Sequence, residues 1–261
     1  YIKRTKVSEY KTQTRGGRGS TGSKTKDADF IEHMFIASNH NYLLLFTELG
    51  KCYWLRVFEI PEAAKTSLGR SIQNLIAFQK EDRVRAYINI ENLSDTEFLQ
   101  NHYIMFCTRQ GTIKKTPLED FSRPRTNGII AISINEGDQL MEAKLTNGSN
   151  EIIIANRTGR AIRFPEANVR SMGRNAAGVR GISLDTDKKD AVVGMICVDP
   201  ADKEATILVV SEKGNGKRSV LEDYRITNRG GKGVKTLQVT ERTGQLIAIK
   251  CVHDTDDLMI T

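Results

Sequence analysis

The feature that most constrains the fold of this chain is an internal repeat marked by glycine. In each unit a short apolar run ends at a glycine, and a basic run begins directly after it. Four segments show this pattern: TELGKCYWLRVFEI, TRQGTIKKTPLEDF, NRTGRAIRFPEANV and SEKGNGKRSVLEDY. Their glycines are Gly50, Gly111, Gly159 and Gly214, and the opening segment YIKRTKVSEY fits the same frame. Self-similarity of this kind indicates a repeat architecture, which limits the possible folds before any local pattern is considered.

A second glycine follows the first one at a nearly constant distance. The separation is 17 residues in the unit that begins at Gly111 and 19 residues in the other three units. A short alternating stretch comes next, as in AGVRGISL and KGVKTLQV, and then an acidic and apolar start such as EDRV or KDAV. Because the pattern occurs five times, we interpret it as one structural unit. The second glycines are Gly19, Gly69, Gly128, Gly178 and Gly233.

Each unit predicts about four short strands, because β-branched and aromatic residues are separated by turns of Gly, Asn and Asp. The runs LLLF, YIMF, IIIA and ILVV alternate only weakly, which predicts strands buried on both faces. The first glycines are spaced 61, 48 and 55 residues apart, close to the period of propeller blades. One helix-like stretch, Ser94–Gln100, lies in an insertion that explains the longest step. We predict an all-β, propeller-like ring of four-stranded blades, since repetition around a ring limits exposed sheet edges.

We expect a single domain over residues 1–261, read as a fragment of a longer protein because it opens and closes on strand-like residues. The last stretch, GQLIAIKCVHDTDDLMIT, supplies the first two strands of a unit, and the opening stretch supplies the last two. Four whole units and two matching halves fit either a closed five-bladed ring or the remainder of six blades. The expected blades are 1–28 (partial), 29–80, 81–135, 136–187, 188–243 and 244–261 (partial).

Basic residues recur at fixed places in the repeat. The chain holds 39 Lys and Arg against 32 Asp and Glu, a net charge of +7 that by itself only hints at an anionic partner. The distribution is more informative, because acidic residues gather near the first strand and in insertions. The repeated basic positions on the third strand are Lys3, Arg4, Lys51, Arg56, Lys114, Lys115, Arg160, Arg163, Lys217 and Arg218. Those in the following loop include Arg70, Arg174, Arg180, Arg229, Lys232 and Lys235.

Repeated charges on a repeated structure form a ring of charge at one height. A continuous positive belt fits a long, rod-like polyanion better than a small ligand, because each neutralised phosphate releases counterions. A plainer interpretation is that these side chains only protect strand edges from pairing. Edge protection works with either sign of charge, whereas these positions hold one sign, so we favour the polyanion.

Within the stretch TQTRGGRGSTGSK, residues 12–24, the RGGRG loop ends at the repeat glycine Gly19 and is therefore expected to connect strands. Successive glycines allow backbone N–H groups to approach an anion closely, and two arginines flank them. The segment Asn228–Gly233 repeats this loop in register. A disordered RGG-type RNA-binding tract is less consistent with one copy bounded by strands. A nucleotide P-loop requires a G-K-[ST] ending and a following helix, and neither is present.

These residues resemble a known family, the C-terminal domain of the DNA gyrase A subunit, over the whole chain. The family's hallmark is a seven-residue box, Q-R-R-G-G-[KR]-G, which the chain matches except at its second position. YIKRT before the box, Met172–Ile182 and Gly216–Tyr224 also look like gyrase blades. The related domain of the topoisomerase IV A subunit is the alternative, although its box is usually degenerate. The box residues here are Gln13, Thr14, Arg15, Gly16, Gly17, Arg18 and Gly19.

The resemblance implies a β-pinwheel, a propeller variant whose blades, usually six, exchange strands with their neighbours. It further implies that duplex DNA wraps around the basic rim, so that strand passage by the remainder of the ATP-dependent topoisomerase introduces negative supercoils. The implied partners are double-stranded DNA, the rest of the gyrase A subunit, and the gyrase B subunit in a heterotetramer. No cofactor is expected in this domain, because the catalytic tyrosine, ATP and Mg belong to other parts of the enzyme.

Other classes of function are poorly supported by the residues. Four dispersed cysteines predict free buried thiols and a reducing, cytoplasmic compartment. The resemblance to gyrase further implies association with the nucleoid. No apolar stretch approaches the length of a membrane span, and the four histidines form no metal or catalytic motif. A protein-binding propeller scaffold predicts apolar loops, whereas these loops are basic and rich in glycine. A propeller hydrolase requires converging carboxylates or histidines, and none recurs in register.

Overall fold

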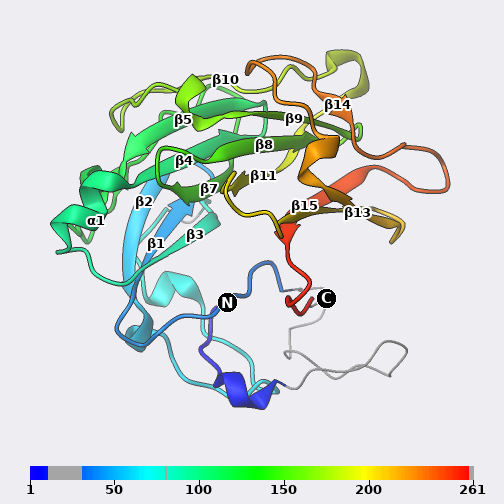
Figure 1. Cartoon of the computed structure of the whole chain (residues 1–261). Coiled ribbons are helices and arrows are strands. Elements are labelled where there is room, and N and C mark those ends of the chain that lie inside the picture. The colour runs from blue at the N-terminus through cyan, green and yellow to red at the C-terminus, as the bar shows by residue number, and fades with distance from the viewer. Residues whose placement is uncertain (11–30, 80, 259–261) are drawn as a thin grey trace.

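The first two sheets of the structure follow the predicted repeat. The computed structural model describes residues 1–10, 31–79 and 81–258, and within them fifteen strands form four antiparallel sheets (Figure 1). The first sheet has the order β3 (Val84–Ile90), β1 (Tyr42–Thr47), β2 (Lys51–Arg56), β6 (Ile129–Ile130). The second has the order β7 (Leu140–Thr146), β4 (Tyr103–Thr108), β5 (Thr112–Pro117), β10 (Val179–Arg180).

The third and fourth sheets have the same plan. The third is β11 (Val192–Val198), β8 (Glu151–Asn156), β9 (Arg160–Pro165), β14 (Val234–Lys235). The fourth is β15 (Leu246–Val252), β12 (Thr206–Ser211), β13 (Gly216–Val220). The single α-helix of the described residues is α1 (Thr96–Asn101), where the insertion predicted one. The 3-10 turns are Val7–Glu9, Val57–Glu59, Ile72–Asn74, Leu118–Phe121, Glu166–Asn168, Thr186–Lys188 and Leu221–Asp223.

The predicted all-β fold of four-stranded blades is confirmed in three sheets. The strands expected to be buried on both faces are β1, β4, β8 and β12. The first three of these are buried almost throughout, whereas β12 alternates between buried and half-buried residues. The fourth sheet has three strands, because β13 pairs with no further strand in the described part of the chain.

Each of the three four-stranded sheets receives its outermost strand from the next repeat. β6 follows β5 in the sequence, yet it pairs with β2 of the preceding sheet, with Ile129 opposite Cys52. β10 joins β5 and β14 joins β9 in the same way. The N-terminal segment continues this pattern through an antiparallel bridge between Ile2 and Arg70. The fold is therefore a propeller with exchanged strands, a β-pinwheel.

Exchange changes how the chain divides into blades. The expected boundary between residues 80 and 81 separates the strand Val84–Ile90 from the strand Tyr42–Thr47. In the structure these two strands are hydrogen-bonded neighbours in one sheet, with Tyr42 opposite Ile90. The stretches beginning EDRV, GDQL and KDAV thus complete the preceding sheet rather than start a new one. The acidic start that suggested a new unit has another role, because Asp82 and Asp138 accept backbone hydrogen bonds that fix the preceding hairpin turn.

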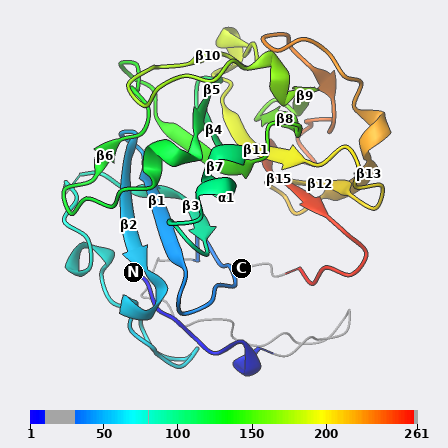
Figure 2. The same cartoon turned by 60° about the vertical axis from the view of Figure 1, so that its left-hand side comes forward.

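Apolar side chains fill the spaces between successive sheets. Phe46 of β1 and Phe106 of β4 meet edge to face at 5.2 Å between ring centroids, and both contact Phe121. All three rings are fully buried, and burial of each contributes on the order of 1.5–3 kcal/mol. The four sheets follow one another around a centre lined by β3, β7, β11 and β15, while β6, β10 and β14 lie at the periphery (Figure 2).

Candidate nucleic-acid interface

The predicted basic positions lie on the outer half of the sheets. In the strand order of each sheet, the third strand and any exchanged strand lie farthest from the centre. The third strands are β2, β5, β9 and β13. The loops that precede the exchanged strands lie at the same periphery (Figure 2). The predicted basic positions are thus not on the inner strands, although those strands carry other cations, such as Lys144 on β7 and Lys250 on β15.

About half of the predicted side chains are free to contact a ligand. They form no hydrogen bond, ion pair or ring contact with any other residue that the structure describes. They come from all four sheets and their peripheral loops, so they are distributed around the described part of the ring. They are Lys51, Arg70, Arg160, Arg174, Arg180, Lys217, Lys232 and Lys235. Arg56 is also exposed, with its guanidinium 4.8 Å from the centroid of the Tyr42 ring.

Several other predicted side chains instead hold neighbouring loops. The Lys3 ammonium donates to the carbonyl oxygens of Ala64, Lys65 and Ser67 at 2.8–3.0 Å, and burial lowers its pKa. Arg229 donates to the carbonyls of Asn168 and Arg180, both at 3.0 Å. Because their donors are satisfied by the backbone, these side chains shape the periphery rather than present charge to solvent.

In three repeats, the cation at one equivalent position of the third strand links its blade to the next repeat. Arg4, Lys115 and Arg163 each form a parallel bridge with a loop of the next repeat. Each also pairs with a carboxylate: Arg4 with Glu62 at 3.5 Å, Lys115 with Glu166 at 3.8 Å, and Arg163 with Glu151. Arg218 holds the same position on β13 and pairs with Asp254 at 2.5 Å. These cations are internal to the blade junctions or already paired.

The sequence predicts Lys114 at the basic rim, but in the structure this lysine is buried. Its side chain is 0% exposed, and its ammonium donates to the carbonyls of Ala131 and Arg174, both at 2.6 Å. The ammonium lies 5.6 Å from the centroid of the Phe106 ring. Burial lowers the pKa of Lys114 to about 8. Lys217, in the same register on β13, is exposed, so sequence alone does not distinguish the two positions.

The loop held by Lys114 has its carbonyl groups bonded and three of its N–H groups without an acceptor in the described residues. The carbonyls of residues 173–176 accept hydrogen bonds from Ala176 N–H, the Lys114 ammonium, the Ser133 hydroxyl and Ser133 N–H, respectively. The N–H groups of Gly173, Arg174 and Asn175 donate to no acceptor that the structure describes. This loop precedes an exchanged strand, as does Asn228–Gly233.

The box residues Gln13, Thr14, Arg15, Gly16, Gly17, Arg18 and Gly19 lie outside the described residues. Their contribution to the interface therefore stays a prediction.

Residues typical of enzyme sites do not converge in the described part of the chain. No group of three or more His, Cys, Asp or Glu side chains there is arranged to hold a metal ion. The four cysteines are free thiols, and burial raises the pKa of Cys52 and Cys107 well above the usual range. Among the described helices, none has the length and apolar character needed to span a membrane.

Known proteins share both the sequence and the fold of this chain. The family model described as DNA gyrase C-terminal domain, beta-propeller, matches residues 1–38, 41–86, 102–147, 150–199 and 205–253. The A subunit of DNA gyrase from Staphylococcus epidermidis is 42% identical over 260 residues, which is 100% of this chain and 28% of that protein. The chain thus spans less than a third of the length of the curated relatives it matches.

Two solved structures are similar to it. The structure of a DNA gyrase A C-terminal domain has a TM-score of 0.82 and 25% identity, with 97% of this chain and 80% of that chain covered. The C-terminal domain of a DNA topoisomerase IV has a TM-score of 0.74 and 28% identity, with 98% and 75% covered. Because the family model matches most of the chain in five segments that follow its repeat, this chain belongs to the family of DNA gyrase C-terminal domains.

Proposed function

We propose that this chain is the non-catalytic part of a DNA gyrase A subunit, and that it wraps duplex DNA around the periphery of the pinwheel. The observation that carries the proposal is the set of eight peripheral cations without a partner in the described residues, distributed over successive blades. Bending 20–30 bp by 40–90° costs on the order of 1–6 kcal/mol, so a wrap requires phosphate contacts along the whole arc. Cations from four sheets supply such a series, whereas a single patch does not.

The remaining partners follow from the relatives, which are A subunits of DNA gyrase. The rest of the A subunit, together with the B subunit in a heterotetramer, would supply strand passage, ATP and Mg. The wrapped segment would then set the sign of the DNA crossing that the enzyme acts on, which yields negative supercoils. Such an enzyme would work in the cytoplasm, on the nucleoid.

The equivalent domain of the topoisomerase IV A subunit is the second candidate, favoured by the structural similarity to a topoisomerase IV domain. The two are separated by the product of the full enzyme. A gyrase introduces negative supercoils into relaxed circular DNA with ATP, whereas an enzyme that only relaxes or unlinks DNA contradicts the gyrase assignment.

Charge removal at the periphery tests the interface. In the full-length protein, Arg160→Gln with Lys217→Gln removes two free outer cations from adjacent blades. Each lost phosphate contact should lower the slope of log K against log salt by about 0.9, so the pair should lower it by roughly 1.8. The affinity for a long duplex should fall at low salt.

The matched control is Lys144→Gln with Lys250→Gln, which removes the same charge from the inner strands β7 and β15. The control should keep the salt slope of the wild type. Equal losses in both variants would mean that net charge, and not the periphery, governs DNA binding.

A further inference from the structure

The centre of the pinwheel carries a second, separate set of charged side chains. The residue directly after the central strand of each sheet is charged: Glu48, Arg109, Arg157 and Glu212. The backbone carbonyls of Glu48, Arg109 and Arg157 each accept a hydrogen bond from the innermost strand of the next sheet. These bonds are Leu140 N–H to Glu48 at 3.0 Å, Val192 N–H to Arg109 at 2.9 Å, and Leu246 N–H to Arg157 at 3.1 Å. The backbone therefore fixes these side chains around the central opening.

The charges at these positions are not balanced. Glu48 accepts hydrogen bonds from Arg85 at 2.6–2.7 Å, so this carboxylate is neutralised. Glu212 accepts from Gln245 N–H at 3.3 Å. The guanidinium groups of Arg109 and Arg157 have no hydrogen-bond or ion-pair partner among the residues that the structure describes. Two adjacent blades thus each present an uncompensated cation to the centre.

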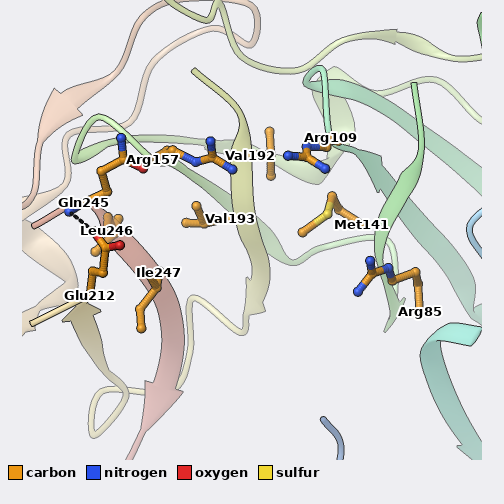
Figure 3. Close-up of a pocket in the computed structure, with 10 residues that line it drawn as sticks. All are labelled: Arg85, Arg109, Met141, Arg157, Val192, Val193, Glu212, Gln245, Leu246 and Ile247. Atoms are coloured by element: carbon orange, nitrogen blue, oxygen red, sulfur yellow. Dashed lines mark hydrogen bonds between the residues drawn. The ribbon is translucent and has the colours of Figure 1, made fainter. Parts of the chain in front are cut away.

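The two arginines line one hollow. Its volume is about 470 Å³, and its walls come from the innermost strands of all four sheets. In Figure 3 the guanidinium groups of Arg157 and Arg109 point toward each other across Val192. Met141, Val193 and Ile247 lie below them, and Glu212 lies beside Gln245 on the same side as Arg157 (Figure 3).

Two like charges that face each other in a recess repel, and an anion placed between them removes that repulsion. A guanidinium binds phosphate oxygens in pairs, so two guanidiniums match a group with three terminal oxygens and two negative charges. We propose that Arg109 and Arg157 bind the dianionic phosphoryl group of a small phosphate monoester in the central hollow. The apolar side chains of the hollow accommodate a compact organic body, and Glu212 accepts from a hydroxyl group on it. This site is distinct from the DNA surface, because it faces the centre between the inner strands and because DNA phosphates are singly charged diesters.

The proposal is tested by calorimetric titration of the full-length protein with phenyl phosphate, a dianionic monoester. The wild type should bind it saturably, and Arg109→Gln with Arg157→Gln should weaken binding by at least about tenfold. Diethyl phosphate, a monoanionic diester, should bind far more weakly at the same ionic strength. The peripheral variant Arg160→Gln with Lys217→Gln should bind phenyl phosphate like the wild type.

Absence of saturable binding to the wild type would overturn the proposal, as would equal losses in the central and peripheral variants. Stability supplies a second measurement, independent of the ligand. Removal of two facing cations should leave the melting temperature of the central variant equal or raised in phosphate-free buffer. Phenyl phosphate should then raise the melting temperature of the wild type only. DNA binding by the central variant should be unchanged, so this inference and the proposed function fail by different results.

Discussion

The first glycine of a repeat combines two constraints that an alanine does not meet where the blade has an exchanged strand. Gly159 has a φ of +82°, and its carbonyl accepts hydrogen bonds from Thr236 and Leu237 beyond the exchanged strand β14. A Cβ added there would lie 2.3 Å from the Leu237 oxygen. Gly214 has a φ of +74°, but a Cβ there would meet nothing within 4 Å, because β13 carries no exchanged strand in the described chain.

These two positions form a matched pair of variants. Gly214→Ala should lower the free energy of unfolding by about 1–2 kcal/mol, the cost of a left-handed backbone for an L-residue. Gly159→Ala should cost a further ~1–3 kcal/mol, because the strand it touches must move. Urea denaturation of both variants measures the difference. Equal losses would contradict strand exchange as the reason for this glycine.

The buried ammonium of Lys114 should stabilise the fold through the two carbonyls it holds. Lys114→Met leaves the oxygens of Ala131 and Arg174 without this donor, a loss of about 1–3 kcal/mol in the free energy of unfolding. Lys217→Met, at the same register on β13, removes an exposed side chain and should change stability by less than about 0.5 kcal/mol. If the Lys217 variant loses as much as the Lys114 variant, the buried contacts are not what matters.

The same lysine predicts a pH dependence. Burial lowers the Lys114 pKa to about 8 in the folded protein, whereas an unfolded lysine titrates at about 10.4. Between these values the unfolded chain binds more protons, so stability from this group rises with pH from about 8 to about 10. The difference in unfolding free energy between the wild type and Lys114→Met should widen over that interval. A constant difference would mean that Lys114 keeps an ordinary pKa.

In three junctions between repeats one cation holds a loop of the next repeat, and Arg163 on β9 offers the clearest case. The Arg163 guanidinium contacts Glu151 on β8 and donates to the carbonyls of Leu221 and Tyr224 at 2.7 and 2.9 Å. It thereby connects the third sheet to the 3-10 turn of the following repeat. Glu151 is 6% exposed, and its carboxylate is paired with this guanidinium.

Arg163→Met should therefore lower the free energy of unfolding by about 3–5 kcal/mol, because it leaves a buried carboxylate unpaired. Arg160→Met on the same strand removes a cation without a described partner and should change stability little. Adding Glu151→Gln to Arg163→Met should recover part of the loss, since the buried charge is then gone. Thermal unfolding of the three variants is the measurement, and no recovery in the double variant would contradict this account.

For the whole pinwheel, the arrangement of free cations around the arc predicts that affinity depends on DNA length. A duplex of roughly 20 bp contacts few blades, whereas one of about 150 bp, the persistence length, can follow the periphery. We expect the longer duplex to bind more tightly per molecule and with a steeper salt dependence, as measured by titration at several salt concentrations. Equal affinity and equal salt slopes for the two lengths would exclude wrapping and leave simple DNA binding.

The elements themselves follow from local residue chemistry. The glycine that ends each apolar run forms a turn with positive φ at Gly50, Gly111, Gly159 and Gly214, and the strands on either side lie where the pattern predicts them. The insertion helix begins within two residues of its predicted start, with the Asp95 side chain accepting from Phe98 N–H as its N-cap. The turns, strands and helix start depend on residues that are near one another in the chain, so a single sequence is enough to predict them.

The sequence alone therefore established the repeat, the all-β blades and the phase of the basic residues. The tertiary structure decided which strand completes which blade, because β6, β10 and β14 pair across repeats and no local pattern encodes a partner in the next unit. It also decided the roles of the cations. Lys114 and Lys217 share a register, yet only Lys114 is covered, since the loop of the next repeat that holds its ammonium through the Arg174 carbonyl has no counterpart beside β13 in the described chain. Burial is a property of the packed neighbours, and for that reason identical positions in a repeat become structural in one blade and free in another.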